Sequence, residues 1–241
     1  MMETCCDDPA GQLLFKLHDF GARGASSKET AAIGGVAHLV NFRGTDTMSA
    51  VVDARRYFQE RMAGYSIPAS EHSTITAWKR DRESAAYTNM LEQFGGESKM
   101  FAVVIDSYDT EKAVGQMWGK DLRDKVLASG STVVIRPDSG DPVVLVPRLI
   151  TQLAKDFGAT QNAKGFYVLN KAVRMLWGDG INELAIRSIL GALKVLRFSA
   201  ENIAFGMGGA LLQGVTRDTC GFAMKASANK TGDETNPLNE N

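Results

Sequence analysis

Residues 132–141 of this 241-residue chain are TVVIRPDSGD, an apolar run that ends directly in a cluster of charged residues. A strand that is buried on both faces has such a continuous apolar pattern, so the charged residues would project from its carboxyl end. The same pattern, an apolar run followed by glycine, acid or base, occurs five more times, at LLFKLHDFG (13–21), AHLVNFRGTD (37–46), FAVVIDSYD (101–109), VRMLWGDG (173–180) and ENIAFGMGG (201–209).

The segments between these runs are long enough for helices. Parallel strands need crossover connections of a dozen or more residues, which are usually helical. The alternation therefore predicts an α/β fold whose polar side chains converge at the carboxyl ends of the strands. Strands are predicted near 13–18, 37–42, 101–106, 132–136, 173–177 and 202–205, and helices near 28–35, 48–62, 71–94, 109–128, 143–157, 181–196 and 209–219.

Composition excludes several classes of protein. The chain is 44% hydrophobic and 23% charged, as is typical of soluble globular proteins. Its 27 basic and 28 acidic residues give a net charge of −1, so no nucleic-acid partner is expected. It has no apolar run of about 18 residues, which predicts no membrane span.

The two ends of the chain predict its organisation and location. The first ten residues, MMETCCDDPA, do not have the pattern of a secretory signal, and the three cysteines (Cys5, Cys6 and Cys220) are expected to be free thiols in a reducing cytoplasm. We predict a flexible lead-in at 1–10, an α/β barrel core at 11–225 and a flexible polar tail at 226–241.

Two early loops combine glycine with groups that suit a flat heterocycle and a phosphate. Phe20 can stack on an aromatic ring and Arg23 can bind phosphate with its guanidinium, although a turn with Phe20 packed inward is an equal alternative. Asp46 can accept a hydrogen bond from an amide and repel a carboxylate. On spacing alone, however, an N-cap role for Asp46 or Thr47 ahead of residues 48–62 is favoured.

Two residues further along suggest proton or phosphoryl chemistry. His72 lies at a predicted helix start, where the helix dipole favours neutral imidazole and hence a nucleophile or a base; a structural or solvated histidine is the commoner case. Asp106 follows a strand and could orient an imidazole or bind magnesium through water. His38, inside an apolar run, is predicted to be a packing residue.

The later loops suit a phosphorylated sugar. Arg136 can bind phosphate or carbonyl oxygen, and Asp138 can accept from ribose hydroxyls; a surface salt-bridge turn is the alternative. Glycine-rich loops at 178–180 and 206–209 would let a phosphate approach backbone N–H groups. The sequence has neither the dinucleotide-binding fingerprint nor a P-loop.

Taken together, these strings resemble the nicotinamide phosphoribosyltransferase family. The matching blocks are KLHDFGARGASSKETAAIGGVAHLVNFRGTDT, GYSIPASEHSTITAW, DSYD, IRPDSGDP, GDG and ENIAFGMGGALLQ followed by TRD. The resemblance implies an irregular (β/α) barrel of the type II phosphoribosyltransferase kind, here incomplete because family members are much longer. It also implies a homodimer with active sites at the subunit interface, or completion by a separate amino-terminal fragment.

The implied reaction transfers phosphoribosyl from phosphoribosyl pyrophosphate to nicotinamide, giving nicotinamide mononucleotide and pyrophosphate in NAD salvage. ATP would be an activating co-substrate and Mg²⁺ a cofactor, with no metal ligand assigned. The implied catalytic residues are His72, phosphorylated by ATP, and Glu71 and Asp106 in support. The implied substrate-binding residues are Phe20 for the nicotinamide ring, Asp46 for its amide, Arg136 for the base, Asp138 and Asp179 for the ribose hydroxyls with Gly178 beside them, Gly208, Gly209 and Arg23 for phosphate, and Arg217 and Lys225 for the neighbouring subunit's site.

Two other functions are compatible with the sequence. The chain could be a non-catalytic fragment that binds nucleotide or a full-length homologue. It could also be another phosphate-binding barrel enzyme, such as an aldolase or a nicotinate-type transferase. In that last case a change at Asp46 would leave the preference between amide and acid unaltered.

Overall fold

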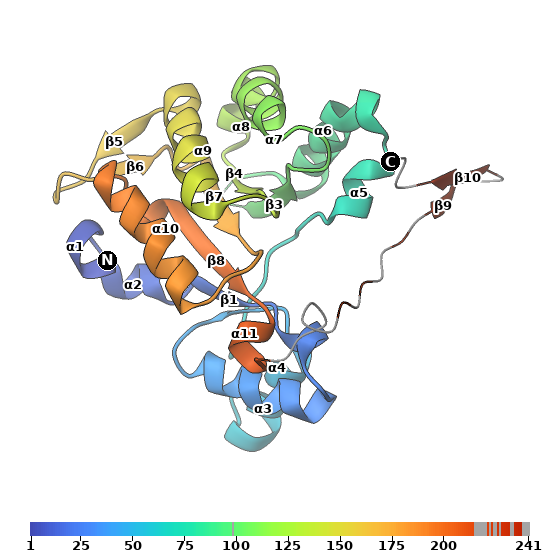
Figure 1. Cartoon of the computed structure of the whole chain (residues 1–241), viewed down its shortest axis with the longest axis vertical. Helices are drawn as coiled ribbons and strands as arrows, with labels where there is room; N and C mark the ends of the chain where they lie inside the picture. The colour runs from blue at the N-terminus through green and yellow to red at the C-terminus, as the bar shows by residue number, and fades with distance from the viewer. Residues whose placement is uncertain are drawn as a thin grey trace.

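The computed structural model describes residues 1–97, 99–214, 221, 223, 226, 228–231 and 234–237. Within this part of the chain, six strands form one sheet in the order β2-β1-β8-β7-β4-β3 (Figure 1). Every neighbouring pair is parallel, so the carboxyl ends of all six strands lie at the same edge. The predicted α/β fold is confirmed. The strands are β1 (Leu17–Asp19), β2 (Gly44–Thr45), β3 (Met100–Val104), β4 (Thr132–Arg136), β7 (Val173–Trp177) and β8 (Ile203–Met207).

Helices connect these strands, and local signals set their ends. Asp109 caps one helix by accepting from the backbone N–H of Lys112, and Asp141 caps another by accepting from that of Val143. Gly130 closes a third in the left-handed conformation, with φ 69°. The helices are α3 (Lys28–Leu39), α4 (Met48–Phe58), α5 (His72–Thr76), α6 (Glu83–Phe94), α7 (Thr110–Lys112), the π-helix η3 (Ala113–Asp121), α8 (Arg123–Ser129), α9 (Pro142–Phe157), α10 (Glu183–Val195) and α11 (Gly209–Leu212), with 3₁₀ turns η1 (Ala22–Gly24), η2 (Arg80–Arg82) and η4 (Ala200–Asn202).

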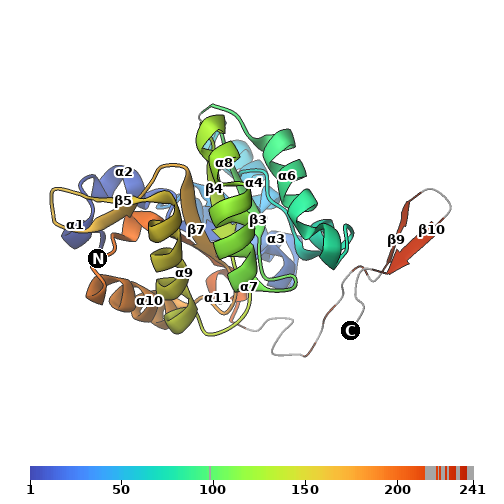
Figure 2. The same cartoon turned by 90° about the horizontal axis from the view of Figure 1, so that it is seen from above.

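The main core lies between the sheet and the helices on its outer face. Helices α6, α8, α9 and α10 gather over that face (Figure 2). Along β4 the side chains alternate, as a strand requires: Val133 and Ile135 are fully buried in this core, whereas Val134 belongs to a second cluster. That second cluster contains Ala102 and Leu176, with Phe20 and Ile67 packed against it.

A short extended segment joins the two edges of the sheet. Residue Tyr65 makes a parallel bridge with Gly44 of β2, and Ala69 makes one with Ala102 of β3. The backbone N–H of Ala102 donates to the carbonyl of Pro68 at 2.8 Å, which ties the far end of the segment to β3. Residues 65–70 therefore connect the edges of a curled sheet that forms an incomplete barrel, as expected, with Phe20 and Ile67 packed against its second cluster.

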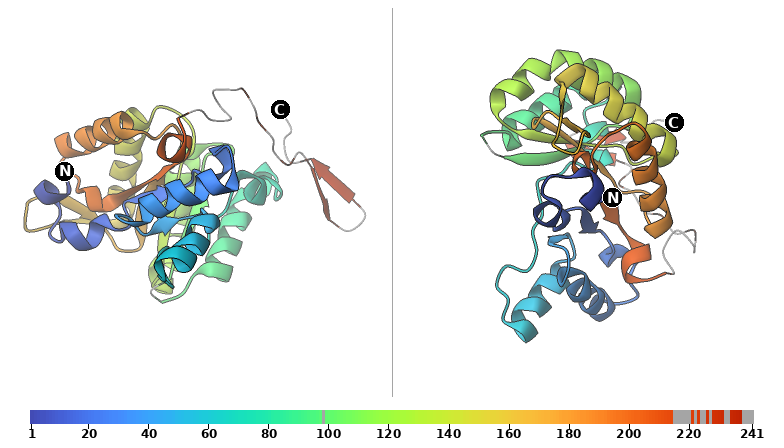
Figure 3. Two further views of the ribbon diagram at one scale, coloured as in Figure 1. Left: turned by 90° about the horizontal axis from the view of Figure 1, so that it is seen from below. Right: turned by 90° about the vertical axis from the view of Figure 1, so that its left-hand side faces the viewer.

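Helices α3 and α4 pack against each other below the strand ends of β1 and β2 (Figures 1 and 3). Their approach depends on a small residue, because a Cβ atom on Gly35 would lie 2.6 Å from Cβ of Ala50. His38, on α3, is buried, and its Nε2 atom lies 2.9 Å from the carbonyl oxygen of Gly44. The expectation that His38 is a packing residue is confirmed.

Three expected elements differ from the structure. The expected strand at 37–42 is wrong, because α3 runs on to Leu39 and the strand is only Gly44–Thr45. An apolar run of four residues suits either a strand or the last turn of a helix. The first strand begins at Leu17 and not at residue 13, since α2 (Pro9–Leu13) precedes it. The expected helix at 71–94 is broken at Lys79, whose φ is 66°.

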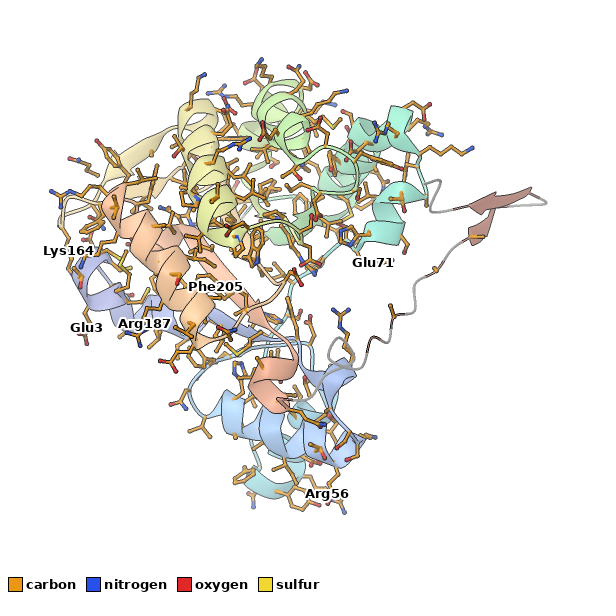
Figure 4. All side chains as sticks on the ribbon, viewed as in Figure 1. Glu3, Arg56, Glu71, Lys164, Arg187 and Phe205 are labelled. Carbon is orange, nitrogen blue, oxygen red and sulfur yellow. The ribbon has the colours of Figure 1, made fainter. Side chains whose placement is uncertain are left out.

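The structure also contains elements that the sequence did not indicate. Residues 1–10 include α1 (Met2–Cys5) and the start of α2, with Cys5 and Cys6 fully buried. This amino-terminal end is tied to a hairpin of β5 (Ala159–Gln161) and β6 (Tyr167–Leu169): Lys164 donates to the carbonyl of Glu3 (Figure 4). Within 226–241, the strands β9 (Ala228–Thr231) and β10 (Glu234–Pro237) pair antiparallel.

Candidate functional site

Eight of the predicted site residues follow the carboxyl ends of the sheet strands. The parallel register of β1 with β2 and β8 places these ends side by side. Loops at this edge of a parallel sheet or barrel are where such folds hold their ligands. The strand β1 is followed by Phe20, β2 by Asp46, β3 by Asp106, β4 by Asp138, β7 by Gly178 and Asp179, and β8 by Gly208 and Gly209.

His72 and Asp106 are in direct contact. The Nε2 atom of His72 lies 3.0 Å from Oδ1 of Asp106, whose side chain is only 3% exposed. The other oxygen of Asp106 accepts from the hydroxyl of Ser139 at 2.5 Å and from the backbone N–H of Asp138 at 3.1 Å. Burial alone would raise the pKa of Asp106, but the donors from His72, Ser139 and Asp138 hold it below its ordinary value.

This pair can orient an imidazole for chemistry. An ionised carboxylate only accepts hydrogen bonds, so Nε2 of His72 carries the proton that it shares with Asp106. The neutral tautomer then has its lone pair on Nδ1. Glu71 is the N-cap residue of α5, where its backbone N–H donates to Thr74 at 3.0 Å.

Arg136 links the Asp138 loop to the aromatic ring of Phe20. An Nη2 atom of Arg136 donates to Asp138 at 3.1 Å, and its Cζ lies 5.4 Å from the ring centroid of Phe20. The Nε atom of Arg136 is buried and has no hydrogen-bond partner among the described residues. A buried donor without a partner is costly, so this atom is suited to a ligand oxygen or water.

Two glycines make room for the Phe20 ring. A Cβ atom on Gly206 would overlap Cε2 of Phe20, and one on Gly178 would lie 3.1 Å from the same atom. The inward packing of Phe20, one of the two alternatives, is therefore observed. Gly206 was predicted as part of a phosphate-binding loop at 206–209, whereas the structure shows that it leaves space for the ring of Phe20.

Asp46 is held by two donors on a single oxygen. Its Oδ1 atom lies 3.0 Å from Nε2 of His18 and 2.6 Å from the hydroxyl of Ser66. Burial would raise the pKa of Asp46, but these donors and the positive charge of Arg136 hold it below its ordinary value. The carboxylate is thus anionic near neutral pH, and more than half of its side chain is exposed to solvent.

The N-cap role that was expected for Asp46 or Thr47 belongs to Thr47 and not to Asp46. The N-cap of α4 is Thr47, which makes no side-chain capping bond. The side chain of Asp46 contacts His18 and Ser66, neither of which the sequence singled out. The sequence alone does not show that β1 pairs with β2 so that His18 lies opposite Gly44, and this register brings His18 close to Asp46.

The remaining predicted residues lie at the rim or outside the described part of the chain. Arg23 is exposed on η1, and a Cβ on the neighbouring Gly24 would lie 3.4 Å from Cα of Gly209. The exposed Asp179 accepts from the indole N–H of Trp177 through its backbone carbonyl, at 2.7 Å. Arg217 and Lys225 lie outside the described residues.

The site is better suited to a metal carried by a substrate than to a metal held by protein alone. Among the described residues, no group of three or more His, Cys, Asp or Glu side chains could hold a metal ion. Both oxygens of Asp106 are already hydrogen-bonded. Magnesium, however, is commonly held by substrate phosphates with one or two carboxylates.

Among the described residues, no helix has the length and hydropathy to cross a bilayer.

Comparisons with known proteins show which family the sequence matches. The model of the nicotinate phosphoribosyltransferase (NAPRTase) family matches residues 15–241. The chain is 56% identical over 227 residues to a nicotinamide phosphoribosyltransferase of Xanthomonas campestris pv. campestris (strain 8004), an alignment that covers 94% of this chain and 48% of the relative. It is 36% identical over 231 residues to the nicotinamide phosphoribosyltransferase of Mycoplasma pneumoniae, covering 90% of this chain and 48% of the relative.

A solved structure supports the fold. The crystal structure of a putative nicotinate phosphoribosyltransferase from Saccharomyces cerevisiae superposes with a TM-score of 0.54 at 17% identity, over 84% of this chain and 47% of that one. At this identity the likeness concerns the fold alone. The chain spans about half the length of the curated relatives that it matches.

Proposed function

The chain belongs to the nicotinate phosphoribosyltransferase family, and from that premise we propose that it carries the catalytic core of a nicotinamide phosphoribosyltransferase. The reaction would join nicotinamide to phosphoribosyl pyrophosphate and release pyrophosphate, giving nicotinamide mononucleotide. Two relatives that share 56% and 36% identity with the chain carry this name.

One observation carries the choice of nicotinamide over nicotinate. Around the Phe20 ring, the site offers an anionic acceptor, Asp46, and a cationic donor, Arg136, which lies over the ring itself. A carboxamide has one N–H₂ donor and one carbonyl acceptor, so it can use both groups. A carboxylate would be repelled by Asp46.

The other strand ends supply groups for the phosphoribosyl part. In this proposal Asp138 and Asp179 accept from ribose hydroxyls, with Gly178 directly before Asp179 in the same loop. The backbone of Gly208 and Gly209 and the side chain of Arg23 bind phosphate. Positive charge that develops on the ribose carbon is stabilised by a fixed polar surrounding. Arg217 and Lys225 would serve the site of a second subunit in a homodimer.

His72 would couple ATP to this reaction. Asp106 holds Nε2–H of the imidazole, which directs the lone pair on Nδ1 toward a phosphoryl group and stabilises the cation that forms. Glu71 precedes His72 at the N-cap of α5 and would support it. Magnesium, bound mainly by pyrophosphate oxygens, would neutralise charge on the leaving group.

The buried free thiols of Cys5 and Cys6 support a cytoplasmic location.

The test measures nicotinamide mononucleotide by chromatography after incubation with nicotinamide, phosphoribosyl pyrophosphate and magnesium. The chain is assayed alone and mixed with the amino-terminal half of a full-length relative. Asp46→Ser should shift preference from nicotinamide toward nicotinate, whereas Asp124→Ser, at an exposed acid on α8, should not. Absence of product in every mixture, with folding confirmed by circular dichroism, would count against the proposal.

The alternative function is that of a non-catalytic chain that binds nucleotide or pairs with a full-length homologue. Ligand binding or mixed dimers without turnover in any mixture would favour this function.

A further inference from the structure

We infer that His18 and Ser66 form a positioning pair that holds the Asp46 carboxylate in one orientation and thereby sets the preference for an amide over an acid. The inference rests on the proposed function, because it concerns the selectivity of that site. It assigns a role to two residues that do not themselves contact the reacting atoms.

Both members of the pair bind the same oxygen. Nε2 of His18 and the hydroxyl of Ser66 lie 3.0 Å and 2.6 Å from Oδ1 of Asp46. Among the described residues, no group donates to the second oxygen, Oδ2, while 53% of the Asp46 side chain is exposed. The carboxylate therefore keeps one acceptor oxygen for a ligand.

The pair is built into the barrel by three separate elements. His18 lies on β1, opposite Gly44 of β2, and Ser66 lies on the segment 65–70 that joins the edges of the sheet. A Cβ atom on Gly44 would lie 2.7 Å from Nδ1 of His18, so glycine there leaves space for the imidazole. The position of Asp46 is thus set by the barrel wall and not by the loop that carries it.

His18 also contacts the aromatic ring of Phe20. Its ring centroid lies 5.0 Å from that of Phe20, with the planes tilted by 54°. His18 is only 15% exposed, so its ring has little freedom to turn. One imidazole therefore fixes the acceptor relative to the ring on which a flat base would stack.

Selectivity depends on this fixed geometry. A carboxylate that can rotate or accept a proton could present a hydroxyl to an acid ligand, which weakens the discrimination that its charge provides. A carboxylate with one oxygen held by two donors stays ionised and presents a bare acceptor. An amide N–H₂ gains from that acceptor, whereas an acid loses.

The experiment uses the whole chain and two matched pairs of variants. His18→Leu and Ser66→Ala remove one donor each, whereas His18→Gln and Ser66→Thr keep a donor at each position. Ser188→Ala, at an exposed position of α10, is the control. Calorimetry gives the dissociation constants of nicotinamide and nicotinate, and carbon-13 NMR of labelled aspartate follows the titration of Asp46.

We expect His18→Leu and Ser66→Ala to reduce the nicotinamide-to-nicotinate affinity ratio by about tenfold, the scale of one charge-assisted hydrogen bond. Both should raise the pKa of Asp46, and the donor-retaining variants should restore both readouts. An unchanged ratio in variants that still bind nicotinamide would overturn this inference alone. A wild-type chain that binds neither base, alone or mixed with the amino-terminal half of a relative, would overturn the proposed function and this inference with it.

Discussion

The imidazole of His72 and the carboxylate of Asp106 meet at 3.0 Å, although 23 residues separate the end of α5 at Thr76 from the start of β3 at Met100. Asp106 is nearly fully buried and is bound at its second oxygen by the Ser139 hydroxyl and the Asp138 backbone. The histidine is therefore held by a carboxylate that is itself held by the next strand loop. Such a layered arrangement fixes both the tautomer and the direction of the ring.

Asp106→Asn should disturb both function and stability. The amide N–H₂ would face donors that the carboxylate accepted, and His72 would lose its anionic partner. We expect ATP stimulation of product formation to fall roughly 10- to 100-fold, on the scale of a positioned acid or base group, and the free energy of unfolding to fall by about 1–3 kcal/mol.

The stability effect of Asp106→Asn should depend on pH. The pKa of Asp106 is lower in the folded state than its ordinary 3.8, so its stabilisation is present above that value and is lost as pH falls through the folded pKa. Urea unfolding at pH 7 and pH 3 should show a smaller difference between wild type and variant at pH 3. An equal difference at both pH values would contradict the hydrogen-bonded, ionised state of Asp106.

His72→Asn separates the two parts of the proposed reaction. The asparagine can donate to Asp106 but cannot accept a phosphoryl group, so ATP stimulation should disappear while basal transfer of phosphoribosyl continues. The measurement is the initial rate with and without ATP, together with the incorporation of labelled γ-phosphate. Stimulation that survives in the variant would exclude a phosphorylated His72.

A pair of glycine variants tests the packing of Phe20. Gly206→Ala would force a Cβ atom into the Phe20 ring, so we expect about 1–3 kcal/mol of destabilisation and weaker nicotinamide binding. Gly191→Ala, in the interior of α10 with open space around it, should instead stabilise by about 0.5–1 kcal/mol. Thermal unfolding and calorimetric titration measure the two effects. Equal stability changes in both variants would mean that Phe20 does not occupy the observed position.

Much of the strand framework could be predicted because a buried parallel strand has a distinctive sequence. The expected ranges 132–136 and 173–177 coincide with β4 and β7. The two-residue strand β2 could not be found in this way, since its pairing is set by β1 and by Tyr65, not by its own composition. The apolar run that precedes β2 forms the last turn of helix α3.

His72 was predicted from a helix start, and most of the other polar residues from the rule that functional side chains follow the carboxyl end of a strand. This rule located Asp106 and Asp138. It could not locate Ser66, because an exposed serine in a loop has no sequence signal until the segment 65–70 is seen to cross between the sheet edges. It could not locate His18 either, since His18 lies one residue before the strand end and acts through its register with Gly44. Ser66 and His18 could therefore be identified only from the pairing of strands in the structure, and not from the periodicity of the sequence.

Lys16 lies at the opposite end of β1 from the site. Its ammonium group donates to the backbone carbonyl of Glu201 at 2.8 Å. Burial, helped by the charge of Arg174, lowers the pKa of Lys16 from 10.5 to about 8. Between these two values the unfolded chain holds a proton that the folded chain has released, so stability rises with pH there.

Lys16→Met, which keeps the length of the side chain without its charge, should remove this rise. The free energy of unfolding of the wild type should increase from pH 7 to pH 9, whereas that of the variant should stay flatter over the same range. The measurement stops at pH 9 because burial raises the pKa of the Cys6 thiol from 9.0 to about 11, and a raised thiol pKa causes stability to fall as pH rises above 9. Urea titrations at half-unit pH steps, with Cys6→Ala as a control, would decide the matter: parallel profiles for wild type and Lys16→Met below pH 9 would show that Lys16 is not desolvated in the folded chain.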